Sequence, residues 1–396
     1  SEVVGAQLGQ DALKGSLIAG IIGLAIVCVF MCWVYLLPGL ASSLALILYT
    51  ELILILLNAF DITLTLPGIA GIILGIGMAV DANVIIFARV KEELTAGKSV
   101  HASLKSGFQK AMSAIVDGNI TTLIAAGVLW LRGSGTVKGF AQTLALGIVV
   151  SMFTALVITR LIIFAFYGAD IRNEKAYGRH LKERKPVDFL GKKKIFFIVS
   201  IILCLAGPVM MGVNHARGIG AMNYSLDFVG GTSTNVTFDK EYTLEEIDSQ
   251  MIPSLEEITG DKNIQVQTVK DSNQVVFKTQ TLDLEKREAL ASYLNENYGV
   301  ETSDIATENI SSTVSSEMRR DAVIAVIIAT ICMLLYIWFR FKDIRFATSA
   351  VVALMHDVLV VLGFYVIARV SVGNTFIACM LTIVGYSING TIVIFD

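Results

Sequence analysis

Charged residues are scarce in this chain. Only 16% of its 396 residues are Asp, Glu, Lys or Arg, whereas about 25% is usual for a soluble domain. Hydrophobic residues make up 54% of the chain before its 33 glycines are counted, and only five residues are proline. So large an apolar fraction needs an apolar solvent. The composition therefore excludes an ordinary soluble domain and predicts a membrane protein.

The sequence also lacks the motifs of several functional classes. It has no glycine-rich loop that would cradle phosphate, no nucleophile beside a base, and no His or Cys set spaced for a metal. Its net charge is −3 and no basic stripe occurs, so nucleic acid is not an expected partner. We therefore expect no enzymatic activity and no cofactor, and any work must draw on an ion gradient or a partner. The cysteines all lie in apolar runs, where disulfides are not expected: Cys28, Cys32, Cys204, Cys332 and Cys379.

Nine apolar segments are long enough to cross a hydrocarbon core of about 30 Å, which takes roughly 20 helical residues. Their ranges are 13–36, 39–60, 66–90, 112–131, 139–167, 195–213, 320–339, 346–369 and 373–395. Basic residues follow the third, fifth and seventh segments, and the stretch 172–194 alone holds nine Lys or Arg. The positive-inside rule predicts that these three loops are cytoplasmic. Residue 1 and the stretch 214–319 are then expected outside.

The stretch 214–319 differs from the rest in composition. Between residues 214 and 318 there are 18 Asp or Glu against seven Lys or Arg, which is typical of a small water-exposed domain. Its pattern predicts strand, helix, strand, strand, helix and strand over 234–239, 244–258, 264–270, 274–281, 284–298 and 303–309, with a hairpin turn at 271–273. That order is the ferredoxin-like α+β arrangement. Such a fold hosts many functions and by itself indicates none.

Two short matches indicate an internal repeat. Residues 81–85 correspond to 390–394, and Asp11-Ala12 corresponds to Asp321-Ala322. Both copies enter the membrane from the same side, so the repeat is parallel, a plan that places coupling-ion sites between the halves. The alternative is chance similarity between apolar helices. We predict a duplicated helical bundle, with the interface of the repeats at Gly77, Asn83, Ser387, Asn389 and Gly390.

Asp81 is the sharpest functional candidate, because ionisable groups inside spans are costly and mark function by default. It lies some 15 residues into its span of about 25 residues, too deep for a short side chain to reach water. Gly77 lies one turn earlier on the same face, and Gly68, Gly71 and Gly75 lie upstream, so this helix is expected to approach a neighbour closely. A carboxylate there can gain and lose a proton if water reaches it. The alternative is an Asp that stays protonated and hydrogen-bonds a neighbouring helix.

Asp117, His356 and Asp357 are further candidates for a proton relay. Asp117 lies within one helical turn of several polar side chains, an arrangement that suits relay and packing roles equally. His356 and Asp357 are adjacent, so we expect their side chains to point about 100° apart and not to form a face-to-face pair. We expect one of them to meet another helix, in a role that is functional or structural with equal weight.

Two other ionisable residues lie in spans. Arg160 is expected to extend its guanidinium to the inner surface, which is a structural role. Glu51 is central in its span but has little polar company, and it is the weaker candidate.

Several motifs resemble those of the SecD/SecF family of protein-export membrane proteins, and the likeness covers nearly the whole chain. Similar to SecD are LPGIAG at 66–71, AVDANV at 79–84, RVKEEL at 89–94, DGNITT at 117–122 and KGFA at 138–141. Similar to SecF are LDFVGGT at 226–232, ALMHD at 353–357 and GYSIN at 385–389.

The resemblance implies a bundle of the resistance-nodulation-division (RND) type in the bacterial inner membrane that uses the proton gradient to help secreted chains outward. The implied partners are the SecYEG channel, a YidC-type insertase, unfolded secretory chains, membrane lipid, and protons or sodium. Asp81 matches the main proton carrier of SecD and Asp117 a second one, while Asp227, Gly230 and Gly231 belong to the motif of the client-side domain.

The resemblance also divides the chain into domains. It implies a SecD-like half at 1–168, a basic cytoplasmic linker at 169–194, a first SecF-like span at 195–213, the outer domain at 214–319 and further SecF-like spans at 320–396. One more helix and a large outer domain are expected before residue 1, and two more helices after residue 396.

Gly390 departs from the family pattern, because SecF usually has Asp after the GYSIN motif. The substitution either impairs proton use, reroutes it through Asp117 or through His356 and Asp357, or reflects a simpler relay. The loss of this carboxylate is tolerable, because Asn389 and Ser387 are still available to hydrogen-bond a protonated Asp81. Two other functions stay open: an RND-type exporter of lipids or small molecules, against which the small single outer domain speaks, and a non-transporting scaffold of the Sec machinery, which Gly390 favours.

Overall fold

The computed structural model describes residues 6–133, 135–178, 188–261, 264–268, 272–310 and 312–395. Within these residues, nine helices or helix pairs are long and apolar enough to span a membrane, which confirms the predicted count. The spans are α1 (Ala6–Tyr35), α2 (Leu37–Ala59), α3 (Leu66–Thr95), α4 (Val100–Arg132), α5 (Gly135–Phe153) with α6 (Thr159–Gly168), α8 (Lys193–Ala216), α13 (Ser312–Phe341), α14 (Ile344–Ile367) and α15 (Asn374–Phe395). A π-helical turn, Thr154–Ile158, joins α5 to α6, and the short α7 (Glu174–Tyr177) lies within the predicted linker range 169–194.

Helix α4 begins twelve residues before the predicted span 112–131. Ser99 caps it by accepting a hydrogen bond from the backbone N–H of Ala102 at 3.4 Å. In the added turns Val100, Leu104 and Phe108 are buried at a spacing of four residues, while His101, Ala102 and Lys105 are exposed. The sequence analysis looked for continuous apolar runs, which identify membrane spans. It therefore did not detect this first part of α4, where only one face of the helix is apolar.

The helices of the N-terminal half pack closely through small residues. A Cβ atom added at Gly71 of α3 would lie 2.7 Å from the Thr143 hydroxyl of α5. The fully buried hydroxyl of Tyr49 from α2 lies between Gly75 of α3 and Gly147 of α5. Glycines let helix backbones approach in this way because they carry no side chain.

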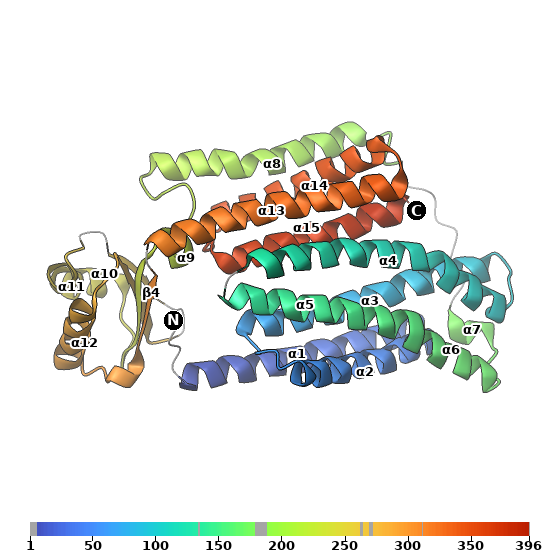
Figure 1. The fold of residues 1–396 in the computed structure, drawn as a ribbon, viewed down its shortest axis with the longest axis horizontal. Helices are drawn as coiled ribbons and strands as arrows, with labels where there is room; N and C mark the ends of the chain where they lie inside the picture. Colours follow the sequence, from blue (N-terminus) through green and yellow to red (C-terminus); the bar gives the residue numbers. More distant parts are fainter. Residues whose placement is uncertain are drawn as a thin grey trace. The chain divides into compact units, whose positions relative to one another are not determined.

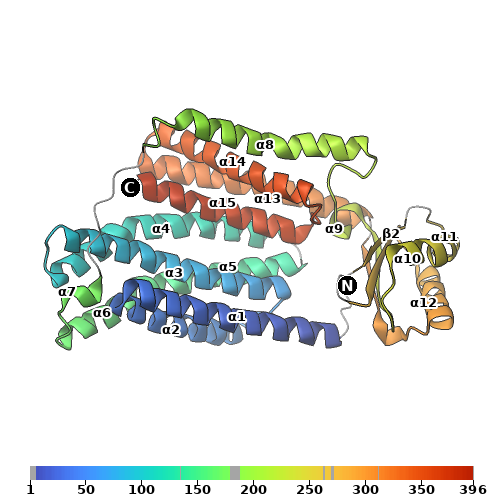
Figure 2. The same ribbon diagram turned by 180° about the vertical axis from the view of Figure 1, so that it is seen from behind.

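The C-terminal half forms a second group of helices, and Figures 1 and 2 show α8 alongside α14. These two helices cross at Gly207 and Gly363, where a Cβ on Gly363 would lie 3.3 Å from the Gly207 Cα. One hydrophobic cluster joins the two halves, with Leu129, Leu144 and Met78 from the first and Met333 and Leu381 from the second. The helices therefore form a duplicated bundle with a common core.

The second compact unit is built mainly from residues 222–322. Its antiparallel sheet has the order β2-β3-β1-β4, with β1 (Gly231–Thr237), β2 (Gln265–Thr268), β3 (Gln274–Thr279) and β4 (Ile305–Ile310). Helices α10 (Leu244–Gln250), α11 (Ile252–Thr259) and α12 (Leu284–Tyr298) lie on one side of the sheet (Figure 2). Val236, Phe277 and Leu294 are among the residues of the core between them. This is the predicted ferredoxin-like arrangement.

Two details of the domain differ from prediction. The helix expected at 244–258 is two helices, because Pro253 in the first turn of α11 has no N–H to continue α10. Strand β1 begins at Gly231, three residues before the predicted start at 234. Gly230 and Gly231 have positive φ angles, 79° and 130°, which favour glycine. Of the turn expected at 271–273, residue 271 lies outside the described residues.

Candidate functional site

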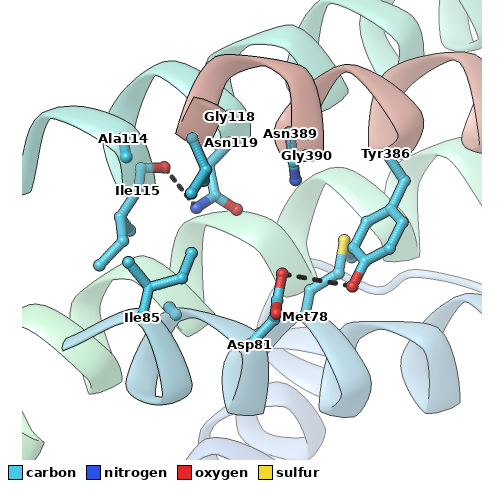
Figure 3. Close-up of a pocket in the computed structure, with 12 residues that line it drawn as sticks. Met78, Asp81, Ile85, Ala114, Ile115, Gly118, Asn119, Tyr386, Asn389 and Gly390 are labelled. Atoms are coloured by element: carbon cyan, nitrogen blue, oxygen red, sulfur yellow. Dashed lines mark hydrogen bonds between the residues drawn. The ribbon is translucent and has the colours of Figure 1, made fainter. Parts of the chain in front are cut away.

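Asp81 lies near the middle of α3, and its carboxylate points toward α15 (Figure 3). The Tyr386 hydroxyl donates a hydrogen bond to its Oδ2 at 3.2 Å. The two partners that the sequence offered, Asn389 and Ser387, do not bond Asp81: the Ser387 hydroxyl bonds Asp357, and Asn389 lies against α4. Tyr386 takes the role because its longer side chain crosses the space between α15 and α3.

A cavity of about 330 Å³ surrounds the Asp81 carboxylate. Three helices line it, as Figure 3 shows: α3 with Asp81 and Met78, α4 with Asn119, and α15 with Asn389 and Gly390. Because liquid water occupies about 30 Å³ per molecule, the cavity has room for several waters. A Cβ atom added at Gly390 would meet no atom within 4 Å. The two equivalent positions of the repeat, 81 and 390, therefore line one cavity, and only one of them carries an acid.

Asp117 is held very differently. The Tyr336 hydroxyl donates to its Oδ1 at 2.7 Å, and the Arg340 Nε donates to its Oδ2 at 2.7 Å. Ser113 donates to Oδ2 at 3.4 Å and also contacts the Arg340 guanidinium. Asp117 is 5% exposed. This cluster, Ser113, Asp117, Tyr336 and Arg340, ties α4 of the first half to α13 of the second.

His356 and Asp357 form a pair, so the expectation that adjacent side chains would diverge is wrong. The His356 Nδ1 lies 2.9 Å from Asp357 Oδ1, whereas the expected contact of one of the two residues with another helix is confirmed by Asp357. The other carboxylate oxygen accepts a hydrogen bond from Ser387 of α15. Ser387 therefore bonds another helix of its own C-terminal half, whereas its neighbour Tyr386 bonds Asp81 of the N-terminal half.

Helices α4 and α15 meet closely beside the cavity. The Thr122 hydroxyl donates to the Gly385 carbonyl at 3.2 Å, and a Cβ added at Gly385 would lie 3.0 Å from the Thr122 Cα. A Cβ at Gly118 would lie 2.7 Å from the Asn389 side-chain oxygen. Asn389 therefore contacts the opposite half directly.

Two residues expected at the interface of the repeats have no such contact. Gly77 is exposed, and a Cβ there would meet open space. The close approach expected of this helix occurs at Gly68, Gly71 and Gly75, which lie against α5 of the same half. The Asn83 side chain is buried and donates to the Ala79 carbonyl of its own helix at 3.0 Å.

The remaining candidates lie apart from this site. Arg160 is exposed on α6, with its guanidinium 5.9 Å from the ring of Phe164. Glu51 is exposed on α2. In the second unit, Asp227 belongs to the short helix α9 (Leu226–Val229), and Gly230 and Gly231 lead from it into β1.

Tyr336, Arg340 and Tyr386 were not among the predicted site residues. Tyr336 and Arg340 are four residues apart and so share a face of α13, but Arg340 was counted only as a loop cation. Tyr386 lies in an apolar span, where a buried phenol hydroxyl usually needs a partner. The sequence therefore offered two signals: the four-residue spacing of Tyr336 and Arg340, and the need of the Tyr386 hydroxyl for a hydrogen-bond partner. Neither signal identifies the helix that these side chains contact.

Comparison with known proteins gives a consistent result. The family described as "Protein export membrane protein SecD/SecF, C-terminal" matches residues 1–168 and 290–396. The protein translocase subunit SecDF of Bacillus subtilis is 37% identical over 415 aligned residues, which cover 100% of this chain and 54% of that protein. The Brucella abortus subunit is 34% identical, covering 99% of this chain and 51% of its own length. The chain thus spans about half the length of these relatives.

Solved structures agree with the sequence relatives. The crystal structure of SecDF from Thermus thermophilus, a translocon-associated membrane protein, superposes with a TM-score of 0.87 at 34% identity and covers 100% of this chain and 53% of that one. The hedgehog release protein Disp of the water bear Hypsibius dujardini shares the fold alone, with a TM-score of 0.50 at 12% identity and coverage of 98% and 61%.

Proposed function

Because the chain belongs to the SecD/SecF family of protein-export membrane proteins, we propose that it works as part of an accessory subunit of the Sec export machinery. In this proposal it lies in the bacterial inner membrane with residues 214–319 on the outer face. It acts beside the SecYEG channel and a YidC-type insertase and uses the proton motive force to assist unfolded secretory chains.

One observation carries the proposal: Asp81 lines a cavity between the two halves and is bonded by Tyr386 from the opposite half. Protonation of Asp81 removes the charge on the acceptor of this bond. A hydrogen bond to an ionised carboxylate is stronger than one to a neutral group. Uptake and release of a proton therefore change the attraction between α3 and α15, and the halves rock as the proton passes.

The other polar clusters have different roles in this proposal. Asp117 is an anchor, because Tyr336 and Arg340 of α13 both hold its carboxylate at 2.7 Å. His356 and Asp357 continue the relay from the cavity into the C-terminal half, because Asp357 bonds Ser387 beside Tyr386. With glycine at position 390, Asp81 alone supplies an acid to the cavity from α3 and α15.

The ferredoxin-like domain is the part that handles the client chain. It is the water-exposed part of the described chain, and its LDFVGGT motif leads directly into β1. Motion of the bundle would shift this domain and hold an emerging chain against backsliding.

The deciding experiment measures export in membrane vesicles that contain the intact protein, with and without a proton gradient. We expect Asp81→Asn to abolish the gradient-dependent part of export. The matched control is Asp61→Asn, the same change at an exposed residue between α2 and α3 whose positive φ (50°) suits Asn as well as Asp. A sodium gradient in place of the proton gradient tests the coupling ion.

A second candidate function is a non-transporting scaffold of the Sec machinery, and the observation that favours it is the lack of a second carboxylate at Gly390. If Asp81→Asn leaves export equally responsive to the gradient, the scaffold is the better account and the proton mechanism is overturned.

A further inference from the structure

The loop between α14 and α15 is joined to the segment that enters the ferredoxin-like domain. The Val372 N–H donates to the Asn223 carbonyl at 2.8 Å, and the Val372 carbonyl accepts from the Ser225 N–H at 2.9 Å. Together these bonds form a parallel β-bridge between Val372 and Tyr224, which we call the Val372 bridge. Val372 is 3% exposed. Residues 371–374 therefore belong to the same compact unit as residues 222–322.

A second contact, within the helical unit, restricts the turn that precedes this segment. The Arg369 guanidinium, just after the end of α14, donates to the carbonyls of Ile219 and Gly220 at 2.8 and 2.9 Å. In this turn, which follows α8, Gly218 and Gly220 have positive φ angles of 76° and 74°. Because glycine leaves a turn conformationally free, the two bonds from Arg369 stiffen a connection that would otherwise move easily.

On its domain side, the Val372 bridge leads directly into the sheet. The Ser225 carbonyl accepts hydrogen bonds from the N–H groups of Phe228 and Val229 at 3.0 and 3.2 Å, which start the short helix α9. Strand β1 follows at Gly231 and is an inner strand of the sheet. The bridge therefore holds the backbone at the entrance to the LDFVGGT motif.

On its helix side, only Gly373 separates Val372 from Asn374, the first residue of α15. Tyr386, which bonds Asp81, lies twelve residues further along the helix, about 18 Å at 1.5 Å per residue. The internal backbone bonds of a helix hold its length, so movement at Tyr386 also displaces the start of α15. The bridge thus connects the helix that contacts Asp81 to the segment that leads into β1.

Two roles compete for this bridge. A fixed anchor would hold the loop between α14 and α15 without responding to the bundle, and a pairing within the hairpin of these two helices would serve that purpose. Val372 instead pairs with the entry segment of the other compact unit, and the boundary between the units falls between residues 374 and 375, in the first turn of α15. This placement favours transmission over anchoring.

We propose that the Val372 bridge carries movements of α15 to the ferredoxin-like domain. When the bond between Asp81 and Tyr386 weakens, α15 shifts, and Val372 displaces residues 223–225 and the start of β1 with it. Arg369 is a positioning residue, because it keeps the preceding turn from absorbing the displacement. This inference rests on the proposed function, since it supplies the route from Asp81 to the domain that handles the client chain.

Hydrogen exchange of the intact protein in lipid nanodiscs tests this transmission without measuring export. Asp81→Asn weakens the bond to Tyr386, because it replaces an ionised acceptor with a neutral one. We expect the Ser225 and Phe228 amides to exchange faster in this variant, by up to about 5-fold, the factor that one hydrogen bond is worth.

An insertion separates the bridge from the helix. Two glycines inserted after Gly373 retain every donor and acceptor of the bridge but make its connection to α15 flexible. Combined with this insertion, Asp81→Asn should no longer change the exchange of the Ser225 amide. The same insertion after Gly97, in the exposed turn between α3 and α4, is the control and should leave the response intact.

A substitution tests the contribution of Arg369 at unchanged loop length. Arg369→Met should speed exchange of the Ser225 amide by about 5-fold and reduce its response to Asp81→Asn. Arg217→Met, the same change at an exposed arginine beside the same turn, should do neither. Protected amides in β3 show that the domain of each variant is folded. If the insertion after Gly373 unfolds the domain, the response in Arg369→Met decides.

An equal response to Asp81→Asn with and without the insertion after Gly373, or with and without Arg369, overturns the inference, because the movement then takes another route. The absence of any response in the protein with its natural loop overturns it as well. Failure of the proposed function gives a different result, in which Asp81→Asn leaves gradient-dependent export unchanged.

Discussion

The two aspartates of the N-terminal half occupy contrasting environments within one bundle. Asp81 has one hydrogen bond, at 3.2 Å, and faces a cavity. Asp117 is 5% exposed and has Tyr336 and Arg340 as partners, both at 2.7 Å. A group that must change charge needs access to water and few fixed partners, whereas a group that holds helices together needs the opposite. The roles proposed for Asp81 and Asp117 are therefore distinguished by their hydrogen-bond partners and access to the cavity, and not by their depth in the membrane.

The largest expected effect comes from leaving the Asp117 charge unpaired. We expect Arg340→Met to lower the free energy of unfolding by about 3 kcal/mol, the lower end of the range for a broken buried pair, because Arg340 is partly exposed. Unfolding of the intact protein in bicelles measures it. Arg132→Met, the same change at an exposed residue at the end of α4, is the control. The double variant Asp117→Asn/Arg340→Met should recover most of the loss; if it does not, the pair is not the cause.

The two tyrosines sharpen the contrast. Tyr336→Phe should lower the free energy of unfolding by about 2 kcal/mol, because it removes a hydrogen bond to a buried charge. Tyr386→Phe should change it by less than about 1 kcal/mol, because water in the cavity can replace the phenol. The same unfolding assay compares the two. Equal losses would contradict the distinction between the sites.

Two glycines of α15 test the packing beside each site. Gly385→Ala should destabilise by about 1–3 kcal/mol through overpacking, because the added Cβ would lie 3.0 Å from the Thr122 Cα. Gly390→Ala should be neutral or stabilising by up to about 1 kcal/mol, because its Cβ meets open space and alanine favours helix. Melting temperatures of the two variants give the comparison. A lower melting temperature for Gly390→Ala than for Gly385→Ala would contradict the open space beside Gly390.

The smallest expected effect concerns Glu246, an exposed carboxylate in the first turn of α10. Glu246 accepts hydrogen bonds at 2.9 Å from the Thr243 backbone N–H and hydroxyl, which lower its pKa below the ordinary 4.5. Its stabilisation of α10 is therefore complete above pH 4.5 and is lost as the pH falls through the lowered value. Hydrogen exchange of the α10 amides should show less protection in Glu246→Gln at pH 6, and the difference should shrink as the pH falls through the lowered pKa. Glu245→Gln, a neighbour in the same turn, is the control and should show no such convergence.

The elements of the fold were largely predictable, because hydropathy identifies spans and alternation identifies strands. Helix α12 has the predicted bounds, Leu284–Tyr298. The partners within the bundle were not predictable to the same degree. Which residue faces Asp81 depends on the rotation and axial offset of α15 against α3, and a shift of one residue turns a side chain by about 100°. For this reason the sequence offered Asn389 and Ser387 as partners of Asp81, whereas the structure has Tyr386 in that position. For the same reason it did not identify Arg340 as the partner of Asp117.

The unequal pair at positions 81 and 390 has a consequence for the proposed proton coupling. Two acids facing each other would let either half take up the proton. With an acid on α3 and glycine on α15, only the N-terminal half offers a carboxyl to this cavity. In the proposed coupling the two halves therefore have different parts: α3 carries the group that changes charge, and α15 responds to it through Tyr386.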